Sequence, residues 1–254
     1  MLGPAELLLV AVSAVAAGAV NALAGGGTLI TFPVLIAVGL PAVAANITNT
    51  VALCPGHVSA MYLQRENLRG RSALLWRLLP AGVVGGLLGG VLLLASGERA
   101  FREAVPFLLL AASAILALQE RVRGWLLRRA SRRGLVGGHA GWAPIVVAVA
   151  SVYGGYFGAG LGVILLAGLG AVLDDSLSRL NAIKQVISLV VNVAAAVFFL
   201  FSGQIVWSAA AVMAVGALAG GAIGGRFARR VRPEVLRLIV VAIGVSLSFV
   251  YLTR

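Results

Sequence analysis

One lysine lies inside an apolar stretch of the sequence, where a charge is costly. Lys184 is the only lysine among the twenty basic residues. A charged side chain within a membrane segment costs at least about 2.5 kcal/mol on insertion scales. Asn181 and Ser188 lie three residues before it and four after it, on one helical face. Asn192 continues this face, and Gln185 is adjacent. We interpret Lys184 as an anion-binding residue on a polar helical face that is directed toward a partner helix or a cavity. The alternative is a lysine that extends to the membrane surface, where Asp174 and Asp175 could pair with it.

A second polar group lies in the first half of the chain. Asn46, Thr48, Asn49 and Thr50 fall within five residues. Asn46 and Asn49 share a helical face, because they are three residues apart. Their amides can donate hydrogen bonds to an oxyanion, which predicts a binding role. The alternative is hydrogen bonding that only joins neighbouring helices.

A glycine triplet, Gly25, Gly26 and Gly27, interrupts the first apolar run and is followed by Thr28. Glycine permits positive φ and exposes backbone amides, and a broken helix in a bilayer is tolerated where it lines a cavity. We expect the amides to face an anion at the N-terminus of a half-helix, with Asn21 in the same cavity. The alternative, close helix packing, is the one we expect for two other glycine groups, Gly85, Gly86, Gly89 and Gly90, and Gly220, Gly221, Gly224 and Gly225.

The two halves of the chain repeat this pattern with one offset. A second glycine stretch, Gly158 to Gly162, follows the first by 135 residues. The same offset places Asn46 on Asn181 and Asn49 on Lys184. Paired interrupted segments in two halves are typical of transporter binding sites.

The composition is that of an all-α integral membrane bundle. Of 254 residues, 61% are hydrophobic and 11% charged, and the mean hydropathy is +1.04. The net charge of +12 gathers in short loops, which indicates membrane topology rather than nucleic-acid binding. One cysteine, Cys54, provides no disulfide framework. We expect no metal site, no cofactor and no enzyme active site. His57 is a single histidine in an apolar helix, and such a histidine is more often a structural group than a proton relay.

Ten helical segments are expected, in two groups of five. Each repeat has a glycine-broken segment followed by about three further transmembrane helices. Repeat 1 comprises residues 1–120, a basic cytoplasmic linker residues 121–141, and repeat 2 residues 142–254. The expected helices are 5–24, 28–39, 42–63, 73–95 and 104–119, with a loop at 96–103, and then 142–157, 161–173, 178–201, 206–226 and 234–252.

Charge suggests how these segments cross the membrane. If each broken segment crosses straight, the basic groups at 121–133 and 226–232 fall on opposite faces, against the positive-inside tendency. If each is a re-entrant hairpin, the basic loops at 65–71, 121–133 and 226–232 share one face. The repeats are then inverted, which suits alternating access. This arrangement predicts a multi-pass protein of the cytoplasmic (inner) membrane.

The sequence resembles the TauE/SafE family, the sulfite-exporter superfamily of permeases. The motifs are AGAVNALAGGGTLITFPVLIAVGLPAVAANITNTVAL (17–53), GYFGAGLGVILLAGLG (155–170) and RLNAIKQVISLVVN (179–192). The resemblance implies secondary transport of sulfite, thiosulfate or organosulfonates, and the family analogy implies export as the direction. The expected partners of the protein are a coupling ion (proton or sodium), the lipid bilayer and further copies of the same chain in a homo-oligomer. The expected substrate-binding residues are Asn21, Gly25, Gly26, Gly27, Thr28, Asn46, Asn49 and Thr50 from repeat 1, and Asn181, Lys184 and Gln185 from repeat 2.

Three other functions remain open at this point. An anion channel would share the same donors but would show no counterflow. A permease for small carboxylates would differ in substrate. A membrane assembly factor for sulfur or cofactor metabolism would need a reactive Cys54.

Overall fold

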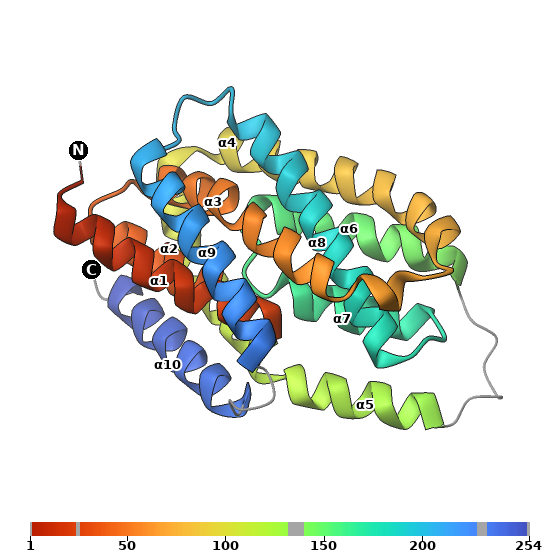
Figure 1. Ribbon diagram of the computed structural model, residues 1–254. Helices are drawn as coiled ribbons and strands as arrows, with labels where there is room; N and C mark the ends of the chain where they lie inside the picture. Colours follow the sequence, from red (N-terminus) through yellow and green to blue (C-terminus); the bar gives the residue numbers. More distant parts are fainter. Residues whose placement is uncertain (1, 24–25, 132–139, 228–232, 253–254) are drawn as a thin grey trace.

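The computed structural model describes residues 2–23, 26–131, 140–227 and 233–252, and within these ranges every regular element is a helix (Figure 1). The fold is thus an all-α bundle of apolar helices. Three described helical stretches are long and apolar enough to span a membrane, Pro4–Asn21, Ser72–Arg128 and Leu177–Phe199. The α-helices are α1 Pro4–Leu23, α2 Thr28–Ala37, α3 Ala42–Leu63, α4 Ser72–Ala117, α5 Gln119–Ser131, α6 Ala143–Tyr156, α7 Leu161–Val172, α8 Leu177–Phe199, α9 Trp207–Phe227 and α10 Pro233–Leu252, with 3-10 turns η1 Arg65–Leu68 and η2 Ala140–Trp142.

Helices from opposite halves of the chain form the closest pairs. The first helix of each half packs along a helix of the other: α1 along α9, and α6 along α4. Glycines allow these approaches, because a Cβ at Gly89 would overlap the Val152 carbonyl oxygen, and one at Gly220 would overlap that of Val15. The packing role expected for Gly85, Gly86, Gly89, Gly90, Gly220 and Gly221 is therefore confirmed, while the surroundings of Gly224 and Gly225 lie outside the described residues.

Each half begins with two helices joined at a glycine segment. In the first half α1 ends at Leu23 and α2 begins at Thr28; in the second α6 ends at Tyr156 and α7 begins at Leu161. Gly158 and Gly160 have φ of 77° and 79°, values that a residue with a Cβ rarely adopts. Aromatic rings join the two pairs at the centre of the bundle, since Phe32 of α2 makes an edge contact with Phe157, with the ring centroids 5.3 Å apart.

The break expected at 96–103 is present, but it is a kink at one residue of α4 rather than a loop. The chain changes direction at one residue, Gly97 (φ 71°, ψ 172°), and helical structure resumes at once. The glycine makes this possible, since its positive φ carries no Cβ penalty. The new direction lets the Glu98 carboxylate accept hydrogen bonds from the amides of Ala42 (2.6 Å) and Val43 (2.9 Å), the first residues of α3.

The segment expected as a basic linker is helical in its first part. Helix α5 covers Gln119–Ser131, and residues 132–139 lie outside the described part. One apolar side chain attaches the helix to the bundle: Leu126 is buried, and it contacts α7 at Gly170. The many arginines of this segment indicated a linker, and the local sequence does not show that Leu126 packs against α7.

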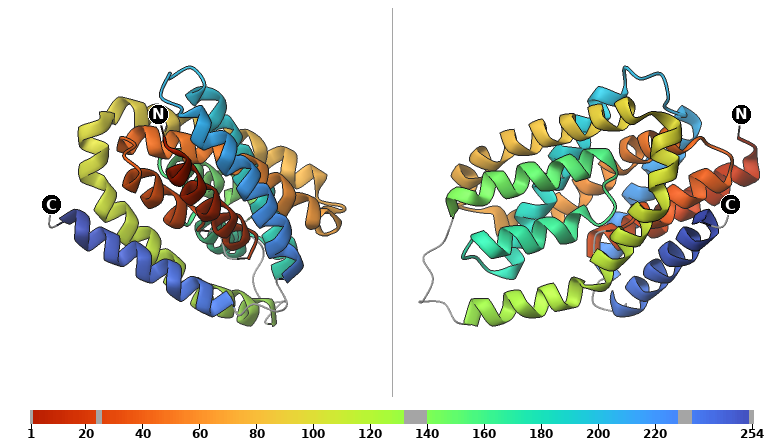
Figure 2. Two further views of the ribbon diagram at one scale, coloured as in Figure 1. Left: turned by 60° about the vertical axis from the view of Figure 1, so that its left-hand side comes forward. Right: turned by 180° about the vertical axis from the view of Figure 1, so that it is seen from behind.

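The bundle has two distinct ends, which Figures 1 and 2 show from three directions. At one end η1 packs on the start of α8, where Arg71 pairs with Asp175 at 2.8 Å; α5 lies toward the same end. At the opposite end lie the N-terminus, the turn inside α4 and the segment between α8 and α9. There the Val206 amide donates to Thr48 Oγ1 at 3.1 Å.

Candidate functional site

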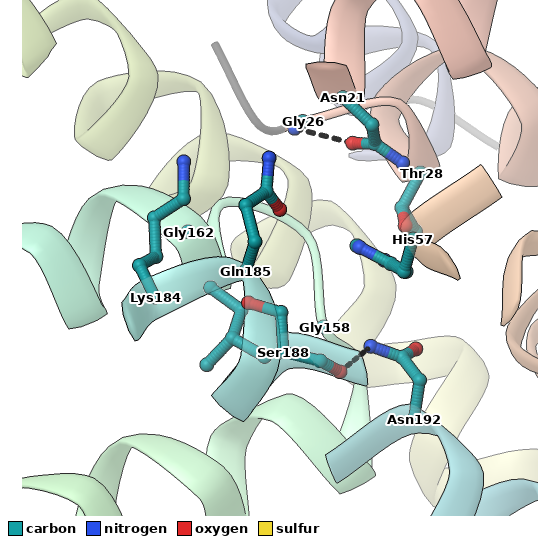
Figure 3. Close-up of a pocket in the computed structure, with 11 residues that line it drawn as sticks. Asn21, Gly26, Thr28, His57, Gly158, Gly162, Lys184, Gln185, Ser188 and Asn192 are labelled. Carbon is teal, nitrogen blue, oxygen red and sulfur yellow. Dashed lines mark hydrogen bonds between the residues drawn. The ribbon is translucent and has the colours of Figure 1, made fainter. Parts of the chain in front are cut away.

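A cavity lies where the two broken helix pairs meet α3 and α8. The centre of a water-sized molecule can reach about 20 Å³ of it, within about 380 Å³ of space free of protein atoms that includes open solvent. Figure 3 shows Lys184 and Gln185 of α8 extending into this space, with Asn21, Thr28 and His57 on the opposite side. The lining residues are Asn21, Gly26, Thr28, His57, Gly158, Leu161, Gly162, Lys184, Gln185, Ser188 and Asn192.

The lining draws on both halves of the chain, in two cases at equivalent positions. Gly26 and Leu161 are 135 residues apart, and so are His57 and Asn192. The first residues of α3 and α8, Ala42 and Leu177, differ by the same offset.

Lys184 carries a charge into this interior without a visible counter-charge. The residue is 3% exposed, and within the described ranges it has neither a hydrogen bond nor an ion pair. The alternative, a lysine at the membrane surface that pairs with Asp175, is not observed. Asp175 pairs with Arg71 and Arg179 instead. A buried charge without a partner is unfavourable, so the site is suited to receive an anion.

Two helix N-termini add to this positive potential. Helices α2 and α7 both begin at the cavity, and Thr28 and Leu161, their first residues, line it. The N-terminus of a helix carries a partial positive charge and attracts anions. No acidic side chain is among the described lining residues. The charge of Lys184 and the two helix N-termini at the lining therefore favour a negative ligand.

The amides of the glycine break are already hydrogen-bonded in this conformation. Asn21 Oδ1 accepts from the amides of Gly26 (3.0 Å) and Gly27 (2.8 Å), so these groups are not free donors as the sequence suggested. Gly27 also has no room for a side chain, because a Cβ would lie 2.5 Å from the Ala17 carbonyl oxygen. Gly25 lies outside the described residues. Asn21 thus joins α1 to the start of α2 while its side chain lines the cavity.

Three polar residues of α3 lie outside the cavity lining, and two of them hydrogen-bond to the helices around the cavity. Asn49 accepts a short hydrogen bond from Thr31 Oγ1 and donates to Thr28 Oγ1 at 3.3 Å, so it holds α2 in place. Asn46 donates to the Tyr156 carbonyl oxygen at 2.8 Å, at the end of α6. Thr50 is buried and its hydroxyl donates within α3. None of these three α3 residues lines the cavity.

Asn181 and Gln185 have different surroundings although both belong to α8. Asn181 Nδ2 donates to Gln64 Oε1 at 2.7 Å, at the η1 end of the bundle, and it does not line the cavity. Gln185 lines the cavity and is 1% exposed, and its Nε2 has no hydrogen-bond partner in the described structure. Its amide is therefore available to a ligand.

Several lining residues were not among the expected binders. Ser188 and Asn192 continue the polar face of Lys184, so their helical spacing contained the signal; here Asn192 Nδ2 donates to the Ser188 carbonyl oxygen at 2.7 Å. His57 comes from α3, and its Nδ1 is buried without a partner among the described groups. The signal for His57 in the sequence is the offset of 135 residues that places it at the position equivalent to Asn192. Gly158 and Gly162 belong to the second glycine stretch.

The chain matches known membrane proteins over nearly its whole length. The family described as Sulfite exporter TauE/SafE matches residues 10–251. A "Probable membrane transporter protein" of Haemophilus influenzae is 30% identical over 226 residues, which cover 87% of this chain and 85% of that protein. "Probable membrane transporter protein ORF9" of a Sinorhizobium species is 26% identical, covering 93% and 88%. "Probable membrane transporter protein YfcA" of Escherichia coli K12 is 24% identical, covering 98% and 90%. The chain is thus a membrane transporter of the TauE/SafE family.

Proposed function

We propose that this protein is a secondary transporter of small sulfur-containing anions, such as sulfite, thiosulfate or organosulfonates. The observation that carries the proposal is Lys184, a buried cation without a partner among the described residues, in a cavity at two helix N-termini. The family description names sulfite export, and this analogy is the support for the sulfur chemistry and for export as the direction.

The hydrogen-bond donors in the cavity, one charged and one neutral, match the acceptors of an oxyanion. A sulfonate or sulfite presents several oxygen acceptors and no strong donor. Lys184 and Gln185 offer ammonium and amide N–H groups to such a ligand. A neutral or cationic ligand would leave the lysine uncompensated, which disfavours both classes.

The packing pattern supports alternating access by two inverted repeats. Equivalent helices of the two halves make equivalent contacts. Helix α1 packs along α9, and its equivalent α6 packs along α4. Helix α3 also packs along α9, and its equivalent α8 packs along α4. The cavity then lies near the pseudo-two-fold axis, where each half supplies a broken helix. Rocking of one half against the other would open it to either side.

The charge distribution supports placing the η1 end in the cytoplasm. The described arginines at that end are Arg65, Arg69, Arg71, Arg77, Arg121, Arg123, Arg128 and Arg179, with the acids Glu66, Glu120, Asp174 and Asp175. The opposite end has Arg99 and Arg102 with Glu6, Glu98 and Glu103. Basic residues are enriched on the cytoplasmic side of membrane proteins. We therefore place the protein in the cytoplasmic membrane with this end inside.

The test is thermal stabilisation of the purified protein by sulfite, thiosulfate, sulfate, sulfoacetate, taurine and acetate. A ligand that binds the folded state raises its apparent stability by mass action. We expect a sulfur anion to stabilise the wild type and Arg77→Ala, which removes a charge outside the cavity, but not Lys184→Ala. Stabilisation by acetate alone would favour a carboxylate permease.

Counterflow in proteoliposomes separates a transporter from a channel. Unlabelled thiosulfate inside should accelerate uptake of labelled thiosulfate by a carrier, whereas an open pore gives only equilibration. Absence of binding and of counterflow for every sulfur anion, in protein that remains folded, would overturn the proposal.

A further inference from the structure

We infer that His57 binds a proton together with the anion, so that transport couples the two. The inference rests on the proposed function and concerns the same cavity. It extends that function by naming the coupling ion, a proton, and the residue that carries it.

His57 is one of only two titratable residues among those described as lining the cavity; the other is Lys184. They come from different halves of the chain, His57 from α3 and Lys184 from α8. His57 Nδ1 is buried and lacks a hydrogen-bond partner in the described structure. A neutral imidazole has one nitrogen that can accept a proton, and histidine is the side chain whose charge changes most readily near neutral pH.

The surroundings make proton binding depend on the anion. Lys184 on α8 is the one formally charged residue among the described lining residues, and it lies across the cavity from His57 (Figure 3). Helices α1, α2 and α7 contribute only neutral lining residues to the described cavity, and Cys54, one turn earlier on α3, donates to the Thr50 carbonyl oxygen. In the empty cavity a protonated His57 would face a second positive charge in a medium of low dielectric constant.

An anion between the two cations reverses this balance. It attracts both, so its binding favours protonation of His57, and protonation favours binding of the anion by the same factor. The proton comes from water on the side where the cavity is open and returns to water on the other side. No carboxylate lines the described cavity to perform this step in place of the histidine.

The experiment uses proteoliposomes that contain a fluorescent pH indicator, with thiosulfate as the probe. Sulfite itself binds protons near neutral pH, so it would obscure the result. In wild type, an imposed thiosulfate gradient should move protons in the direction of the anion. His57→Asn, which introduces the residue found at the equivalent position 192, should lose this proton movement, and its thiosulfate counterflow should be weaker than that of wild type and no longer depend on pH. His139→Asn changes the chain's other histidine and is the matched control.

Each other outcome has a definite meaning. Thiosulfate transport by wild type without proton movement would overturn the inference and leave the proposed function intact. Proton movement retained in His57→Asn would also overturn it. Loss of counterflow in both His57→Asn and His57→Gln would make His57 a residue for anion binding rather than coupling. If wild type shows neither binding nor counterflow of any sulfur anion, the proposed function fails, and the inference fails with it.

Discussion

Replacing Lys184 with methionine should change two properties of the protein in opposite directions. Methionine keeps much of the side chain's length and removes the ammonium group. Lys184 is 3% exposed, and the described residues offer it no counter-charge. The empty protein therefore carries the cost of a charge inside a membrane segment, about 2.5–3.5 kcal/mol on insertion scales. Lys184→Met should raise the stability of the empty protein by up to about 3 kcal/mol.

The same substitution should weaken anion binding. A hydrogen bond from an ammonium group to an anion contributes about 1.5–3 kcal/mol. Because about 1.4 kcal/mol corresponds to a tenfold change in Kd, the affinity for thiosulfate should fall about ten- to hundredfold. Thermal unfolding without ligand measures the first effect, and a thiosulfate titration of the thermal shift measures the second.

Two control variants and one outcome make this reasoning refutable. Lys184→Arg keeps the charge and should remain responsive to thiosulfate, although its fork-shaped group has a different geometry. Arg77→Met removes an exposed charge outside the cavity and should change neither property appreciably. If Lys184→Met unfolds more easily than wild type when empty and binds thiosulfate unchanged, Lys184 is a structural residue and the proposed site is elsewhere.

Four further substitutions test the framework around the cavity by thermal unfolding. Asn21→Ala removes the acceptor of two amide hydrogen bonds and should lower the free energy of unfolding by about 2 kcal/mol; no loss would mean that water replaces the side chain. Asp175→Asn should cost less than about 1 kcal/mol, because its arginine partners are partly exposed, and high salt should reduce the difference from wild type. Gly89→Ala should cost about 1–3 kcal/mol, because the added Cβ overlaps the Val152 carbonyl oxygen. Gly97→Ala should cost only about 1 kcal/mol, because its Cβ enters open space and only the positive φ is unfavourable; equal losses at the two glycines would contradict this distinction.

The sequence predicted the helices well where apolar runs end at strong local signals. The expected helix at 42–63 is observed with those bounds, and the helix after the second glycine stretch begins at Leu161 as expected. Proline and glycine mark these ends, and their effect on the backbone is local. Prediction was wrong about the length of the break at Gly97, which is a single-residue kink, and about α5, because the packing of Leu126 depends on a distant part of the chain.

For the candidate site, residue type identified Lys184, and the repeat offset related it to Asn49. A charge in an apolar run and a shared register are properties that the amino-acid sequence contains by itself. The sequence alone did not determine which polar groups face the cavity. Asn49 holds α2, and Asn181 binds Gln64, which is 117 residues away along the chain. Only the tertiary structure brought His57 opposite Lys184, because the direction of a polar side chain is decided by the helices that pack against it.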